Sequence, residues 1–128
     1  MASILRVNTL TDASSNNSIA MSFVAGGSAK AYANVDMTGT AALDGSFNIS
    51  GLTDDGTGQF TLTINSDMGN ANYSFSVGFN DQSSDVGPVL KVTGEAGVQT
   101  GQISFQKKEN NSLVDCDVNC VQILGDLA

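Results

Sequence analysis

Apolar and polar residues alternate one by one through most of the chain from residue 29 onward. In the segment 29–37, Ala31, Ala33, Val35 and Met37 fall on one side, and Lys30, Tyr32, Asn34 and Asp36 fall on the other. Because successive side chains of a strand point to opposite faces, this period predicts strands with one face toward a core. About seven such strands are predicted, at residues 29–37, 47–49, 59–65, 72–79, 89–92, 103–105 and 113–124.

Turn-forming residues separate these strands at short intervals. Gly, Asp, Asn and Ser gather at residues 44–45, 53–58, 67–70, 81–88 and 94–97. No window has the apolar spacing of an amphipathic helix, so we expect almost no helix. The pattern predicts an all-β fold, an antiparallel β-sandwich of jelly-roll-like type with about seven or eight strands. Its core is expected to hold the phenylalanines of the alternating faces, Phe47, Phe60, Phe75, Phe79 and Phe105.

The first 28 residues have a different pattern. Two short apolar pieces, 3–10 and 19–24, flank the polar run 11–18. Neither piece is long enough to bury itself, so the segment either joins the main sheet or docks on a neighbouring chain. We divide the chain into an N-terminal extended arm, 1–28, and a β-sandwich domain, 29–128. The apolar side chains at the start of the arm are its predicted docking residues: Ile4, Leu5 and Val7.

Charge and composition exclude several classes of function. Five Lys and Arg against thirteen Asp and Glu give a net charge of −8, which repels nucleic acid. No apolar run approaches the roughly 18 residues of a spanning helix, so membrane insertion is not expected. The start of the sequence has no secretory pattern, which predicts synthesis in a cytoplasm with reduced thiols. The absence of histidine removes the common catalytic triads and imidazole ligands, and no cofactor is expected.

The C-terminal run partly matches a calcium-binding loop. Residues Asp115 to Asn119 copy the opening of that loop and Asp126 takes its twelfth position, but Cys120 replaces the required glycine. We therefore favour a terminal strand with acidic residues on a wet or edge face. On such a strand Cys116 and Cys120 share a face roughly 13 Å apart, too far for a disulfide. They are interpreted as small buried side chains; alternatively, one or both meet their copies at a symmetry axis.

Four carboxylates lie in predicted turns, at Asp54, Asp55, Asp81 and Asp85. Two or three of them could converge on a calcium ion or flank a sugar for acid/base cleavage. Turn formation and solubility explain them without either function, and we favour that interpretation.

Several longer segments resemble a module that recurs in virion proteins of tailed bacteriophages, marine ones especially. The resemblance is carried by residues 3–19, 23–34 (FVAGGSAKAYAN), 46–61, 68–73 and 112–125, and so spans nearly the whole chain. In those proteins the module forms tail-fibre-like or knob-like appendages. The resemblance implies a homotrimer attached to the particle by its N-terminal segment. It also implies a place in the virion after assembly in the host cytoplasm.

Three functions are then weighed. The first is a structural virion protein, a short tail fibre or spike whose arm binds a tail, portal or capsid protein. Its distal loops would contact a host surface glycan or protein through Asp54, Asp55, Thr57, Asp81 and Asp85. The second is a capsid decoration protein that stabilises the head. The third, a glycan-active enzyme, needs two carboxylates about 5 to 9.5 Å apart in a groove and is the least favoured; we do not expect an enzyme.

Overall fold

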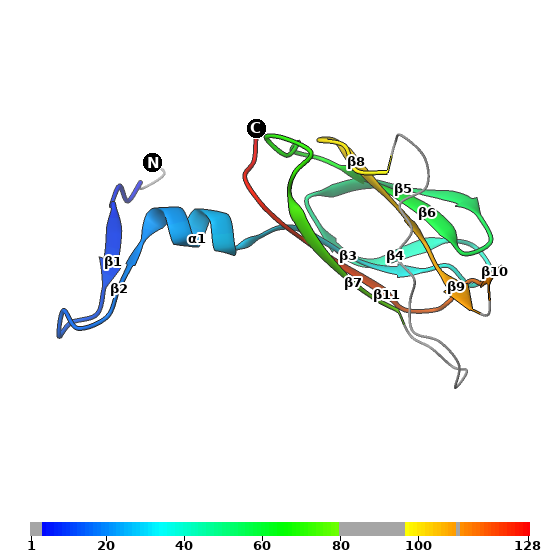
Figure 1. The fold of residues 1–128 in the computed structure, drawn as a ribbon, viewed down its shortest axis with the longest axis horizontal. Coiled ribbons are helices and arrows are strands. Elements are labelled where there is room, and N and C mark those ends of the chain that lie inside the picture. Colours follow the sequence, from blue (N-terminus) through cyan, green and yellow to red (C-terminus); the bar gives the residue numbers. More distant parts are fainter. Residues whose placement is uncertain (1–3, 80–96, 110) are drawn as a thin grey trace.

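The computed structural model describes residues 4–79, 97–109 and 111–128, and its main body is two antiparallel sheets packed face to face (Figure 1). One sheet has the strand order β4-β3-β11-β7, and the other has the order β5-β6-β8. The all-β antiparallel sandwich predicted from the alternation is confirmed. The strands are β3 (Ala29–Asp36), β4 (Ala42–Phe47), β5 (Ile49–Gly56), β6 (Gln59–Ile64), β7 (Ser74–Phe79), β8 (Gln102–Gln106) and β11 (Asn119–Leu124).

The core lies between the two sheets and is built from the inward positions of the strands. In β3 the predicted alternation is confirmed, since Ala31, Ala33 and Val35 are buried while Tyr32 is exposed. Small alanines on this strand let the other sheet approach closely, and larger side chains fill the space from β6 and β8. The buried hydrophobic residues are Ala31, Ala33, Val35, Met37, Phe60, Leu62, Ile64, Met68, Tyr73, Ile103, Phe105, Val121 and Ile123.

Three phenylalanines join the two sheets. Phe60 and Phe105 lie on paired strands of the three-stranded sheet, with ring centroids 5.4 Å apart. Phe75 of the opposite sheet meets Phe105 edge to face at 5.9 Å. Such edge and tilted contacts suit the charge distribution of aromatic rings. The prediction of a phenylalanine core is correct for Phe60 and Phe105, whereas Phe75 and Phe79 are only partly buried against it.

The prediction that Phe47 belongs to the core is wrong, because the chain changes sheets at the next residue. Asn48 takes a positive φ of 56°, so that Phe47 faces outward from one sheet and Ile49 enters the other. The Asn48 side chain holds this corner, donating to the carbonyl of Lys30 at 3.0 Å and accepting from the Ser66 amide at 2.8 Å. Phe47 is left 56% exposed.

The predicted terminal strand 113–124 is also wrong in its extent and position. The short strands β9 (Lys108–Glu109) and β10 (Ser112–Leu113) pair with each other, and no strand covers residues 114–118. The true last strand, β11, lies between β3 and β7, so it is a central strand and not an edge. The predicted strand at 89–92 lies outside the described residues.

The segment before the sandwich forms its own small structure. Strands β1 (Thr9–Thr11) and β2 (Ser18–Ala20) make a hairpin, followed by the short helix α1 (Met21–Gly27). Of the two expectations for this segment, joining the main sheet is therefore wrong. Figure 1 shows the hairpin and helix standing to one side of the sandwich. Lys30 ties the end of α1 to β3, because its ammonium donates to the carbonyls of Ala25 and Ser28.

Candidate functional site

Large apolar side chains of the segment 4–28 are exposed to solvent. The candidate docking residues Ile4 and Leu5 are 76% and 80% exposed, and Val7 is also exposed. The helix α1 has no buried residue, and its Phe23 is 72% exposed. Exposed hydrophobic residues of this size gathered on one segment are typical of an interaction surface.

The polar run between β1 and β2 is an organised turn. The Asp12 carboxylate accepts hydrogen bonds from the side chain of Ser14, the amide of Asn16 and both the amide and side chain of Asn17. Hydrogen bonding from the Asn17 side chain, more than from the other groups, lowers the pKa of Asp12 below its ordinary value of 3.8. This turn fixes the register in which Leu10 faces Ile19.

The candidate loop residues are only partly within the described structure. Asp54 accepts from the amide of Gly56 at 2.9 Å, Asp55 accepts from the Thr61 hydroxyl at 2.6 Å, and Thr57 is exposed at the end of the β5–β6 hairpin. Asp81 and Asp85 lie outside the described residues. The Thr61 hydroxyl is also 2.7 Å from that of Ser104, so Asp55 continues a polar row across the strands β5, β6 and β8. The local hydrogen bonds of Asp54 and Asp55 agree with the interpretation that these carboxylates form the turn.

The calcium-like motif is used for a different purpose. Asp115 accepts a hydrogen bond of 2.6 Å from the amide of Gly58, a residue with a φ of 65° between β5 and β6. The carbonyl of Gly58 in turn accepts from the Lys107 amide at 2.7 Å. Asp115 therefore joins the 114–118 segment to the β5–β6 turn, a role that its spacing in the sequence did not suggest.

The two cysteines have different surroundings, and the prediction that they share one face is wrong. Cys116 precedes β11 and is buried, whereas Cys120 lies on β11 and is exposed; both are free thiols. The Cys116 thiol donates to Asn119 Oδ1 at 2.9 Å, and burial raises its pKa. The interpretation of both as buried side chains is thus correct for Cys116 and wrong for Cys120.

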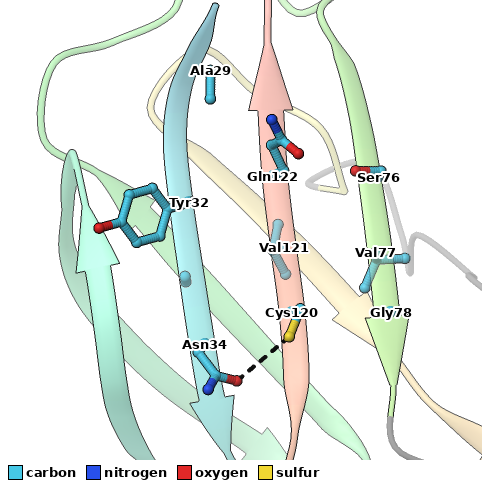
Figure 2. Close-up of a pocket in the computed structure, with 10 residues that line it drawn as sticks. Ala29, Tyr32, Asn34, Ser76, Val77, Gly78, Cys120, Val121 and Gln122 are labelled. Atoms are coloured by element: carbon cyan, nitrogen blue, oxygen red, sulfur yellow. Dashed lines mark hydrogen bonds between the residues drawn. The ribbon is translucent and has the colours of Figure 1, made fainter.

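A shallow depression of about 520 Å³ lies on the outer face of the four-stranded sheet. Its sides come from the neighbouring strands β3, β11 and β7, and Figure 2 shows the side chains that line it. The lining residues that carry a polar side-chain group are Tyr32, Asn34, Ser76, Cys120 and Gln122. No charged residue is among the described residues that line the depression.

The register of the sheet places an aromatic pair at one border of this depression. Tyr32 on β3 is directly opposite Phe47 on β4, and their rings stack with centroids 6.0 Å apart and planes 21° from parallel. The sequence analysis missed this aromatic pair because it assigned Phe47 to the core and gave the outward residues of 29–37 no role. The available signal was Tyr32, an aromatic residue at an outward position between Lys30 and Asn34.

In the described part of the chain, no group of three or more Cys, Asp or Glu residues is arranged to hold a metal ion. The same residues include no helix of the length and apolar character needed to cross a membrane. Comparison of the chain with protein-family models, with curated proteins and with solved structures gave no match.

Proposed function

We propose that this chain is a structural protein of a tailed-phage virion, a short tail-fibre or spike-type appendage. Residues 4–28 bind another protein of the particle, and the sandwich projects from that attachment point. One observation carries the proposal: Ile4, Leu5 and Phe23 are each more than 70% exposed, while the sandwich has a complete core of its own. The family resemblance in the sequence supplies the kind of particle and the homotrimeric state.

The stability of the segment 4–28 supports a partner. A two-stranded hairpin is marginally stable alone, and a helix of seven residues is too short to be stable by itself in water. Burying one Leu, Ile or Phe side chain contributes about 1.5 to 3 kcal/mol. Six large apolar side chains of this segment are available for such burial: Ile4, Leu5, Val7, Leu10, Ile19 and Phe23. Contact with a second protein would therefore stabilise the segment 4–28 and, at the same time, attach the sandwich to the particle.

The test is incorporation into particles. In a phage whose copy of the chain lacks residues 2–10, the shortened protein should be folded, with a cooperative thermal transition, but absent from purified particles. A finer variant, Ile4→Ser with Leu5→Ser, should also be lost from particles. Its matched control, Asn8→Ser with Thr9→Ser, changes exposed polar neighbours in the same segment and should be retained.

Normal incorporation of the deletion variant would overturn the attachment role. The place of the full-length chain on the particle distinguishes an appendage from a decoration protein. Labelled copies confined to the tail or one vertex support the appendage, whereas labelling over the whole head surface would replace it with the decoration role. Sedimentation of the purified chain tests the trimer, since a trimer has three times the monomer mass of 13.1 kDa.

A further inference from the structure

We infer that the depression on the outer face of the four-stranded sheet binds a short, uncharged saccharide. This inference rests on the proposed function: only if the chain is a virion appendage would the site bind a glycan on a host surface. It places the contact on the strands β3, β11 and β7, and residues 54–58 of the other sheet do not line the depression. The binding chemistry itself is carried by the side chains of the depression.

The first element of the site is an aromatic platform. Tyr32 is 49% exposed and Phe47 is 56% exposed, although both rings belong to regular strands. Tyr32 lines the depression, and its ring is stacked against Phe47, which lies on the neighbouring strand β4. The face of an aromatic ring is electron-rich, and it attracts the polarised C–H groups on the flat face of a pyranose ring. A platform of this kind holds a sugar without requiring any charge.

The second element is a set of neutral hydrogen-bonding groups beside the platform. Gln122 on β11 is opposite both Tyr32 on β3 and Ser76 on β7, so the three form one row across the sheet. Strands are about 4.8 Å apart, which makes this row roughly 10 Å long, enough for a disaccharide. Within the described part of the chain, the side chains of Gln122 and Ser76 make no hydrogen bond. Their donors and acceptors are therefore available to sugar hydroxyl groups.

The next row completes the floor of the depression. Cys120 on β11 is opposite Asn34 and Gly78, and its thiol makes a long contact of 3.7 Å with Asn34 Oδ1. Figure 2 shows Asn34, Cys120 and Gly78 together at one end of the depression, with Gln122 and Ser76 toward the other. Gly78 has no side chain, so a ligand can approach the backbone of β7 closely. A volume of about 520 Å³ lies within the range of small-molecule sites.

The charge of the lining selects the class of ligand. Among the described lining residues there is no cation to hold a sialic or uronic acid and no carboxylate to hold an amine. The chain as a whole carries a net charge of −8, which further disfavours acidic sugars. Amide, hydroxyl and aromatic groups without charge are complementary to an uncharged saccharide, whose own groups are hydroxyls and C–H faces.

The binding test uses an array of immobilised disaccharides built from glucose, galactose, mannose and N-acetylglucosamine, with sialylated and uronic-acid disaccharides beside them. The full chain should bind one or more of the uncharged sugars and none of the acidic ones. Tyr32→Ala should weaken that binding at least about tenfold, because it removes the stacking surface at the depression. Tyr32→Phe keeps the ring and should retain binding within about threefold. Thr53→Ala, at an exposed position on the other sheet, is the matched control and should bind as the parent chain does.

The exposed thiol gives a second readout on the same site. A bound sugar should slow the reaction of Cys120 with a maleimide, at the concentrations where the array shows binding, and Tyr32→Ala should abolish this protection. Gln122→Ala should weaken binding severalfold while its thermal unfolding transition stays unchanged.

Absence of binding to every uncharged sugar, or binding of acidic sugars only, would overturn the inference. It would also be overturned if Tyr32→Ala left sugar binding intact but changed the oligomeric state of the chain, since the face would then be a contact between copies. The two proposals fail separately: Tyr32→Ala should still enter particles, and deletion of residues 2–10 should leave sugar binding unchanged.

Discussion

The side-chain amide of Asn119 donates a hydrogen bond of 2.8 Å to the main-chain carbonyl of Val35, 84 residues earlier in the chain. The same amide reaches the carbonyl of Cys116 at 3.1 Å, and its oxygen accepts from the Cys116 thiol. The Cys116 carbonyl also accepts from the amide of Met37 at 2.9 Å. One asparagine, only 1% exposed, thus joins the start of β11 to the end of β3.

Replacing Asn119 by alanine should lower the free energy of unfolding by about 1 to 3 kcal/mol, because it removes a hydrogen-bond partner from a buried carbonyl. Urea denaturation measures this change. Gln122→Ala is the matched control on the same strand, where the side chain is exposed, and should stay within about 0.5 kcal/mol of the parent chain. Equal losses in the two variants would contradict the role given to Asn119.

Replacing Gly58 should destabilise the fold more than replacing Asn119. An added Cβ would lie 2.6 Å from the Val114 amide nitrogen and 2.8 Å from the Lys107 carbonyl oxygen, both of them backbone atoms. A non-glycine residue in the left-handed region costs roughly 1 to 2 kcal/mol. Gly58→Ala should lower the free energy of unfolding by well over that amount, because the added Cβ also meets backbone atoms. Gly39→Ala is the control, because Gly39 has a φ of 71° but open space around its Cβ position. If both variants lose the same stability in urea, the crowding at Gly58 is not important.

The alternation of the sequence was enough to predict the layers of the fold, because an inward position of a strand must be apolar. It correctly placed Ala31, Ala33 and Val35 on the inner face of β3. It failed at Phe47, where the positive φ of Asn48 changes which side the next residue faces. A corner made by one residue leaves no period in the sequence.

The candidate sites depended on pairing, which a single sequence does not contain. Tyr32 meets Phe47 only because β3 and β4 are paired in one register. Gln122 and Ser76 join the same face because β11, the last strand, inserts between β3 and β7. The apolar residues Ile4 and Leu5, by contrast, could be selected from the sequence, since they lie in a segment too short to bury them.

The two thiols should react at very different rates. Cys120 is exposed, whereas Cys116 is buried, donates to Asn119 and has a raised pKa, so its reactive thiolate is scarce. A disulfide reagent should modify one thiol quickly in the native chain and two after unfolding in urea. Cys120→Ser should remove the fast reaction. Two fast thiols in the native parent chain would contradict the burial of Cys116.

Tyr73 gives a prediction at alkaline pH. Burial raises the pKa of Tyr73 from 10.0 to about 12, and its hydroxyl donates to the carbonyl of Gln99 at 2.9 Å. The neutral form is thus favoured by folding, so its contribution to stability is complete below pH 10 and is lost as the pH rises through about 12. In Tyr32→Phe, Tyr73 is the remaining tyrosine of the chain, and tyrosinate absorbance should titrate near 12. A native midpoint near 10 would contradict this prediction.

The turn at Asp12 gives the matching prediction at acidic pH. Its hydrogen bonds from Asn17, Ser14 and Asn16 lower its pKa below 3.8, so the carboxylate stabilises the β1–β2 hairpin fully above that pH. This stabilisation should be lost as the pH falls through the lower pKa of the folded state. The NMR amide signals of Asn16 and Asn17 should then shift with a midpoint below 3.8. In Asp12→Asn, which keeps an acceptor oxygen but does not titrate, the shift should disappear. A midpoint at or above 3.8 in the parent chain would show that the turn does not hold the carboxylate in this way.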